Sequence, residues 1–170
     1  MTMDSQDVLD VLVVLEEAGV SGAWLDGGWG VDALLGAQYR DHGDADIVVP
    51  VEELDVVIGA LADVGFRVTT DHRPTRMELM DRAGRVIDLH PVRFDEDGVG
   101  WQSGAAPGGG DAEYPYNSFT YGWIAGQRVA CIGPELQMEH HLGYEPSEQD
   151  REDMRRIHDR FTLPLPDAYR

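Results

Sequence analysis

Hydrophobic residues recur at helical spacing in several segments of the chain. Val8 and Leu15 fall on one face of a helix predicted over residues 5–18. Ser5 is positioned to cap the start of this helix, and Gly19 to end it. The same criteria predict further helices over residues 29–35, 51–64, 134–142 and 147–160.

Short apolar runs bounded by glycine, proline or aspartate predict strands between these helices. They cover residues 23–26, 47–49, 66–70, 76–80, 85–90, 119–125 and 128–132. Two pairs of these strands form hairpins, around the turns at residues 81–84 and 126–127. Because helices and strands interleave and hairpins occur, we expect an α/β (α+β) fold in which helices flank a mixed sheet.

Residues 95–118 are rich in glycine, proline and aspartate and are predicted to form a long surface loop. Such a loop is a natural place for substrate contacts. Candidates to line a sugar or base pocket are its aromatic residues, Trp101, Tyr114 and Tyr116. The tryptophans of the predicted elements are expected in the core instead: Trp24, Trp29 and Trp123.

The chain has 170 residues, which is the usual size of one domain. We therefore expect a single domain over residues 1–170. Its core would cover residues 20–132, and short C-terminal helices would cover residues 133–162.

The composition is strongly acidic, with 32 acidic and 13 basic residues, so the formal charge is 13 − 32 = −19. This charge repels phosphate backbones, so we expect no nucleic-acid partner. It suits a small cationic partner or a divalent metal ion, and it equally suits solubility alone. All 13 basic residues are arginine. The lack of lysine excludes a Walker-type P-loop, Schiff-base or pyridoxal chemistry, and a ligase that forms a lysyl adenylate.

Cys131 is the single cysteine, so an internal disulfide is excluded and a reducing cytoplasm fits. No apolar run approaches the ~20 residues that a membrane span needs. We therefore expect a cytoplasmic protein with no membrane contact.

Asp44 and Asp46 stand two residues apart at the start of an apolar strand. Because side chains alternate along a strand, both carboxylates are expected on the same face. Carboxylates this close repel one another unless a cation lies between them, and oxygen ligands favour Mg²⁺. The alternative is a pair of solvated aspartates at a strand edge.

Asp88 lies among apolar neighbours in the strand candidate Val86–His90. An unpaired aspartate on a central strand is costly to bury. A third carboxylate facing the first two would share the metal ions or take a proton from a substrate hydroxyl group. The alternative is an edge-strand aspartate that faces water.

Gly27 and Gly28 connect a predicted strand to a predicted helix. Glycines let the backbone approach a ligand closely, and the free N–H groups at a helix start attract phosphate. Arg40 and His42 precede the aspartate pair and could hold phosphate oxygens against the metal ions. The alternatives are a simple turn, a surface arginine and a hydrogen-bonded loop histidine.

Together these residues resemble the nucleotidyltransferase superfamily typified by DNA polymerase β. The resemblance is closer to the lincosamide/aminoglycoside nucleotidyltransferase family, which modifies antibiotics. It rests on the runs Trp24–Asp32, Arg40–Ile47 and Ile87–Pro91, and on the C-terminal residues Pro134–Gln137, His141, Gly143, Tyr144 and Asp150.

This resemblance implies transfer of a nucleoside monophosphate, AMP from ATP, to a hydroxyl group of an aminoglycoside or a lincosamide. It implies two Mg²⁺ ions bound by Asp44 and Asp46, with Asp88 as general base and further metal ligand. The residues implied to bind the nucleotide phosphates are Gly27, Gly28, Arg40 and His42.

Relatives of this length pair two chains, so a homodimer is expected. The acidic residues within 95–113 favour a cationic acceptor, an aminoglycoside. The alternative hypothesis is an antitoxin-like or regulatory protein of the same fold that modifies or binds a partner protein.

Overall fold

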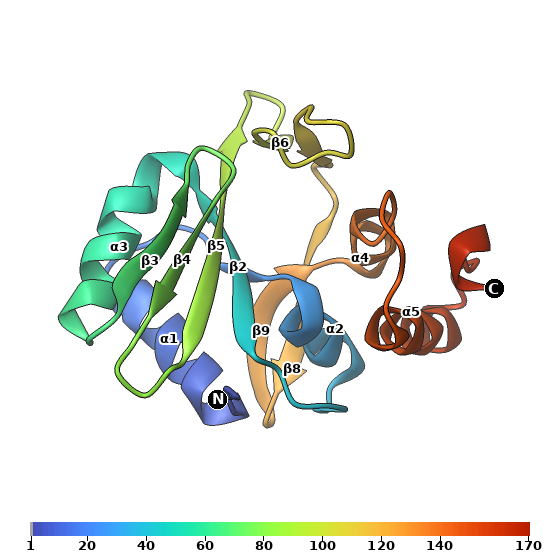
Figure 1. Cartoon of the computed structure of the whole chain (residues 1–170), viewed down its shortest axis with the longest axis horizontal. Coiled ribbons are helices and arrows are strands. Elements are labelled where there is room, and N and C mark those ends of the chain that lie inside the picture. Colours follow the sequence, from blue (N-terminus) through green and yellow to red (C-terminus); the bar gives the residue numbers. More distant parts are fainter. Residues whose placement is uncertain (1) are drawn as a thin grey trace.

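The computed structural model describes residues 2–170, which form five α-helices and nine strands (Figure 1). The α-helices are α1 (Ser5–Glu17), α2 (Gly27–Leu35), α3 (Leu54–Asp63), α4 (Pro134–His140) and α5 (Glu148–Phe161). Two 3₁₀ turns are η1 (Val51–Glu53) and η2 (Asp167–Tyr169). The strands are β1 (Trp24–Leu25), β2 (Asp44–Pro50), β3 (Arg67–His72), β4 (Arg76–Met80), β5 (Val86–Phe94), β6 (Gly100–Gln102), β7 (Ala112–Tyr114), β8 (Phe119–Ile124) and β9 (Gln127–Ile132).

The strands form one mixed sheet in the order β3-β4-β5-β2-β1-β9-β8. β2 and β5 run parallel at its centre, and their register places Asp46 opposite Asp88 and Val48 opposite His90. The hairpins β3–β4 and β8–β9 are antiparallel and lie at the two ends of the sheet. The expected mixed sheet with flanking helices is therefore confirmed.

Each face of the sheet packs against a different set of apolar residues. Ile47 and Leu89 point into the main core, where they meet residues of α1 and α3. Val48 belongs to a second cluster on the other face, with Tyr114 and Leu136. Because side chains alternate along β2, this second face is also the one that carries Asp44 and Asp46.

The C-terminal helices lie beside α2 on the right of Figure 1. Val31 of α2 packs against Met154 and Ile157 of α5 in a separate small core. This core attaches α5 to the helix whose first turn contains the two glycines.

Two helix starts differ from the sequence prediction because a neighbouring aspartate caps the helix. Asp4, and not Ser5, caps α1, since its side chain accepts a hydrogen bond from the Asp7 N–H and its own N–H donates one to the Asp7 carboxylate. α2 begins at Gly27, two residues earlier than expected, because Asp26 accepts a hydrogen bond from the Gly27 N–H. The glycine pair therefore forms the first turn of α2 and does not precede it.

The predicted loop over residues 95–118 contains the short strands β6 and β7, which extend the sheet from β5. The prediction for Trp123 is also wrong, since 53% of this residue is exposed. β8 is the edge strand, and α2 packs on the side of Gly122, where an added Cβ would overlap the Ala33 carbonyl group. Trp123 points to the opposite, uncovered side.

Within residues 2–170, none of the helices combines the length and apolar character that a membrane crossing requires.

Candidate active site

Two carboxylates and an imidazole meet at the centre of the sheet. Asp46 on β2 and Asp88 on β5 are register partners, and His90 lies two residues after Asp88 on the same face. One ligand atom from each residue lies within 4.8 Å of the others. His90 Nε2 is 3.5 Å from Asp46 Oδ1 and 3.9 Å from Asp88 Oδ2. We call Asp46, Asp88 and His90 the central cluster.

Asp26 connects the central cluster to α2. Its Oδ1 accepts a 2.7 Å hydrogen bond from the Gly27 N–H. Its Oδ2 is 3.4 Å from His90 Nδ1 and 3.8 Å from His140 Nδ1 of α4. One buried carboxylate thus contacts side chains or backbone of α2, β5 and α4.

Asp44 lies on the same face as Asp46 but at the outer end of β2, where it is exposed and opposite Val86. Although Asp44 is exposed as a residue, partial desolvation of its carboxyl group raises its pKa, and the Asp88 charge raises it further. The structure thus brings Asp46 and Asp88 together and places Asp44 one step farther out. The metal-binding and catalytic roles expected for all three stay predictions.

The carboxylates of this face repel one another. Burial raises the pKa of Asp46 to about 7, against an ordinary value of 3.8, and the charges of Asp44 and Asp26 contribute to the rise. Burial also disfavours the charge on His90, but its contacts with Asp26 and Asp88 outweigh this and raise its pKa well above the usual value. For Asp26, the polar contacts with the His140 and His90 imidazoles overcome the effect of burial and lower the pKa.

A divalent cation fits this donor set. Among residues 2–170, Asp88 Oδ1 is a buried oxygen without a hydrogen-bond partner. Asp88 Oδ2 is neutralised by Arg76 of β4, whose Nη1 lies 2.9 Å away, and Arg76 also pairs with Glu78. A cation bound here would give Asp88 Oδ1 a partner and would stabilise the charged form of Asp46, whose pKa is raised.

The two glycines lie against the side chains of the site. Gly27 has a φ of +54°, and an added Cβ would overlap Asp46 Oδ2. At Gly28, a Cβ would overlap His42 Nδ1 and crowd Arg40 Nη2 at 2.7 Å. Only glycine lets the first turn of α2 approach this closely, so the N–H end of the helix adjoins the central cluster.

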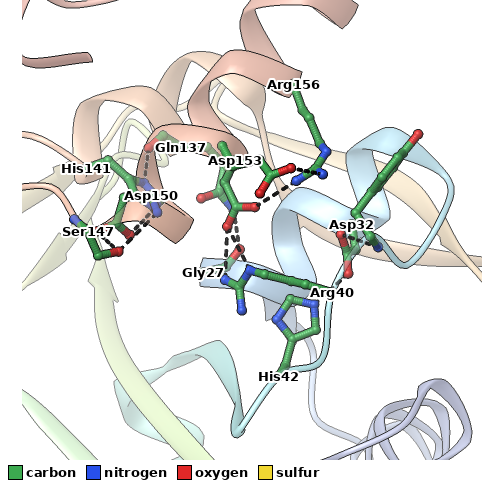
Figure 2. Close-up of polar contacts among 12 residues, drawn as sticks. Gly27, Asp32, Arg40, His42, Gln137, His141, Ser147, Asp150, Asp153 and Arg156 are labelled. Carbon is green, nitrogen blue, oxygen red and sulfur yellow. Dashed lines mark hydrogen bonds and ion pairs between the residues drawn. The ribbon is translucent and has the colours of Figure 1, made fainter.

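Arg40 and His42 are both engaged by acidic side chains (Figure 2). Arg40 Nη2 donates a 2.9 Å hydrogen bond to Asp153 Oδ2 of α5, and Asp153 is buried. His42 is buried with its Nε2 2.5 Å from Asp32 Oδ2 and its ring 4.6 Å from the ring of Trp29. This geometry favours a structural role for His42, and the expected phosphate contacts of both residues stay predictions.

A cavity of about 810 Å³ opens beside the central cluster. Asp46 and His90 line its floor, and residues 104–107, 111–114 and 139–144 line its walls. Tyr114 lines it as expected, whereas Trp101 and Tyr116 are not among its lining residues. The segment that the sequence predicted for substrate contacts therefore does border the cavity.

Sequence reasoning did not identify four residues at this site: Asp26, Arg76, His90 and His140. A signal for two of them was present. His90 lies two residues after Asp88 on the same strand, so both side chains point to the same face of the sheet. Arg76 lies two residues before Glu78, the register partner of Asp88, so its side chain points to that face as well. Asp26 and His140 depend on how α2 and α4 pack, which no local pattern indicates.

Comparison with known proteins adds independent findings. Residues 7–157 match the family model for aminoglycoside-2''-adenylyltransferase. A lincosamide resistance protein of Staphylococcus haemolyticus is 36% identical over 134 residues, which are 79% of this chain and 82% of that protein. A 2''-aminoglycoside nucleotidyltransferase of Klebsiella pneumoniae is 29% identical over 108 residues, which are 64% of this chain and 56% of that protein.

Two solved structures of antibiotic-modifying enzymes also resemble this chain. The lincomycin-bound lincosamide antibiotic adenylyltransferase LnuA superposes with a TM-score of 0.81 at 32% identity, covering 92% of this chain and 98% of its own. The enzyme ANT(2'')-Ia with adenylyl-2''-tobramycin gives 0.71 at 21% identity, covering 92% and 88%, and supports the fold alone. These similarities confirm the nucleotidyltransferase fold expected from the sequence.

Proposed function

The chain belongs to the aminoglycoside-2''-adenylyltransferase family, and on this premise we propose that it transfers AMP from ATP to a hydroxyl group of an antibiotic. Membership of this family makes it a nucleotidyltransferase, and its family implies a nucleotide substrate and a divalent metal ion. The observation that carries the proposal is the central cluster, which lies at the start of α2 and on the floor of the cavity.

Asp46 and Asp88 would hold a divalent cation, with Asp44 as a further ligand at the outer end of β2. We propose Mg²⁺ as the ion under cellular conditions. When bound, it would neutralise charge on the phosphates and on the acceptor oxygen. The N–H group of Gly28 would bind a phosphate oxygen, because it belongs to the first turn of α2. The N–H group of Gly27 donates to Asp26, so Gly27 would contact the phosphates through its lack of a side chain, which lets them approach the backbone closely.

Asp88 is the residue that we propose as general base. Its Oδ1 has no hydrogen-bond partner within residues 2–170. A carboxylate oxygen has two lone pairs, so Oδ1 would bind the cation with one and accept the proton of an acceptor hydroxyl group with the other. Arg76 holds Oδ2 and thereby fixes the carboxylate plane. Beyond this proton transfer, the protein would act by positioning the two substrates and by stabilising the negative charge that develops at the α-phosphate.

The acceptor that the cavity fits best is a cationic aminoglycoside. Glu113 of β7 and Glu139 of α4 line the cavity from different elements, and Asp111 adds a third carboxylate. Across the described residues 2–170, neither glutamate takes part in an ion pair. Carboxylates in this arrangement attract ammonium groups. A lincosamide, with one amine, would use this surface less.

The alternative of a regulatory or antitoxin-like protein is not favoured, since the relatives described above are antibiotic-modifying enzymes. A homodimer and a cytoplasmic location stay predictions.

The proposal is tested by incubating the protein with labelled ATP and Mg²⁺ and a panel of aminoglycosides and lincosamides. We expect label to reach at least one acceptor, and Asp88→Asn to abolish the transfer. Asp63→Asn is the matched control, because it removes one carboxylate from the exposed end of α3 and should leave the rate unchanged. The proposal is wrong if no acceptor is labelled and Asp44→Asn leaves nucleotide binding unchanged.

A further inference from the structure

The imidazole of His90 lies between two sets of carboxylates. Nδ1 faces Asp26, with 3.4 Å to Oδ2. Nε2 faces the other way and lies 3.5 Å from Asp46 Oδ1 and 3.9 Å from Asp88 Oδ2. The two ring nitrogens therefore have different partners, and only Nε2 points to the pair of carboxylates proposed to hold the cation.

This is the arrangement of a metal-binding histidine with an outer carboxylate. In such sites one ring nitrogen binds the metal, while the other gives its N–H to a carboxylate that fixes the tautomer and the ring orientation. Asp26 is placed to be that carboxylate, because it is buried and its other oxygen is held by the Gly27 N–H. When a cation displaces the proton on Nε2 and Nδ1 keeps its own, the Nε2 lone pair binds the cation.

The second independent sign of a ligand is at Asp88. This residue is 4% exposed, and its Oδ1 has no hydrogen-bond partner in the described residues 2–170. Arg76 contacts only Oδ2, and it can keep its pair with Glu78 if a cation engages Asp88. The ligand atoms of Asp46, Asp88 and His90 already lie within 4.8 Å of one another.

We infer that one divalent cation of the proposed reaction is bound by His90 Nε2 together with Asp46 and Asp88, and that this position prefers Mn²⁺ to Mg²⁺. The inference rests on the proposed function for the presence of a cation, and it goes further in naming a nitrogen ligand. Imidazole suits transition-metal ions, whereas Mg²⁺ takes oxygen ligands. The two carboxylates suit both Mn²⁺ and Mg²⁺, so it is the added imidazole that favours Mn²⁺ over Mg²⁺ at this position.

The test is pulsed electron paramagnetic resonance on the whole chain with Mn²⁺ alone. We expect ¹⁴N modulation from a directly bound imidazole in the wild-type protein. His90→Gln should abolish it and weaken Mn²⁺ binding at least ~10-fold. Asp26→Asn should keep the modulation and weaken binding roughly tenfold, because it removes only the outer carboxylate.

Two histidine variants serve as matched controls. His72 is exposed on β3, and His140 contacts Asp26 without belonging to the central cluster. His72→Gln and His140→Gln should both keep the ¹⁴N modulation. If His90→Gln does not fold, these two controls and the wild-type spectrum still decide the question. Absence of modulation in the wild type, or its loss in His140→Gln, overturns the inference.

Competition between the two ions gives a second measurement. We expect the wild type to bind Mn²⁺ at least ~10-fold more tightly than Mg²⁺, and folded His90→Gln to lose most of this preference. Equal affinities in the wild type overturn the inference. The transfer assay separates it from the proposed function: transfer without ¹⁴N modulation leaves the function standing, and modulation without transfer to any acceptor leaves only the metal site.

Discussion

Asp46 is the residue at which the requirements of the site oppose those of stability. Burial raises its pKa to about 7, so its charged form is destabilised in the fold. A carboxyl whose folded pKa is raised contributes stability that is lost as the pH rises from about 4 through 7. At pH 8 without divalent cations, the charged Asp46 therefore lowers the stability of the protein.

Asp46→Asn should accordingly raise the melting temperature while it abolishes transfer. The raised pKa corresponds to roughly 1–3 kcal/mol after allowance for partial solvent access, which is about 3–10 °C for a domain of this size. The rate of transfer should fall at least ~1,000-fold. Differential scanning fluorimetry in EDTA at pH 8 and the labelled-ATP assay measure the two effects. A lower melting temperature for Asp46→Asn would contradict this account.

Residue patterns alone predicted some parts of the site and not others. The spacing of Asp44 and Asp46 correctly placed both on one face of a strand. His42 and Asp32 could not be paired from the sequence, because their contact depends on a loop that folds back over the first turns of α2. His90 had the correct strand parity, but the sequence could not indicate that Asp26 would orient its ring.

Among the elements, α3 offers a direct test of helix stability away from the site. Gly59 lies in the middle of this helix, is exposed, and would have open space around an added Cβ. Gly59→Ala should stabilise the protein by about 0.5–1 kcal/mol, because alanine loses less backbone entropy in a helix. Urea unfolding measures the change, and the transfer rate should stay the same.

Gly27→Ala is the informative comparison, since its Cβ would overlap Asp46 and its φ is positive. It should destabilise the protein and reduce transfer. Equal effects of the two substitutions would mean that the α2 turn does not require glycine.

Arg85 connects two elements by ion pairs, to Asp7 of α1 at 2.8 Å and to Asp81 of the β4–β5 turn. The pKa of Asp81 is lowered even though burial alone would raise it, because hydrogen bonds from Arg85 favour the charged form. A lowered carboxyl pKa contributes stability that is present above the unfolded value of about 4 and is lost as the pH falls through the folded value.

Arg85→Met should therefore destabilise the protein by about 1 kcal/mol at pH 7 and much less at pH 3. Melting curves between pH 7 and pH 3 measure the difference, with Arg82→Met as the control at an exposed arginine of the same turn. A constant difference across this range would mean that packing of the Arg85 side chain, and not its charge, stabilises these elements.

At this scale the hairpins were the most predictable elements, because turn residues and alternation are local signals. The β8–β9 hairpin closes at Ala125 and Gly126, one residue from the expected turn. The strands β6 and β7 were missed because each has three residues, and both depend on pairing that extends from β5. Short strands in a segment rich in glycine and proline carry no pattern of their own.

In the whole molecule, the site depends on a pairing that sequence spacing could not give. β2 and β5 lie side by side only after the chain has passed through α3, β3 and β4. The register that places Asp46 beside Asp88 is set by the packing of that whole segment. The expectation that these residues meet came from the family resemblance, and periodicity supplied only the face of each strand.

The net charge of −19 is also a property of the whole molecule, and it should give salt two opposite effects. Repulsion among carboxylates destabilises the compact state, and salt screens it, since the Debye length falls from about 30 Å at 0.01 M to about 10 Å at 0.1 M. The melting temperature should therefore rise by a few degrees between 10 and 200 mM NaCl, which corresponds to an increase of about 1 kcal/mol in the free energy of unfolding.

Attraction between the cavity and a cationic acceptor is screened by the same ions, so the KM of an aminoglycoside should rise roughly tenfold over this range. Glu113→Gln combined with Glu139→Gln should flatten that rise, because these carboxylates line the cavity from two different elements, β7 and α4. The KM of ATP in the same protein is the internal control. If the aminoglycoside KM does not change while the melting temperature rises, the acidic surface serves solubility, and the cavity recognises its acceptor by shape and hydrogen bonds.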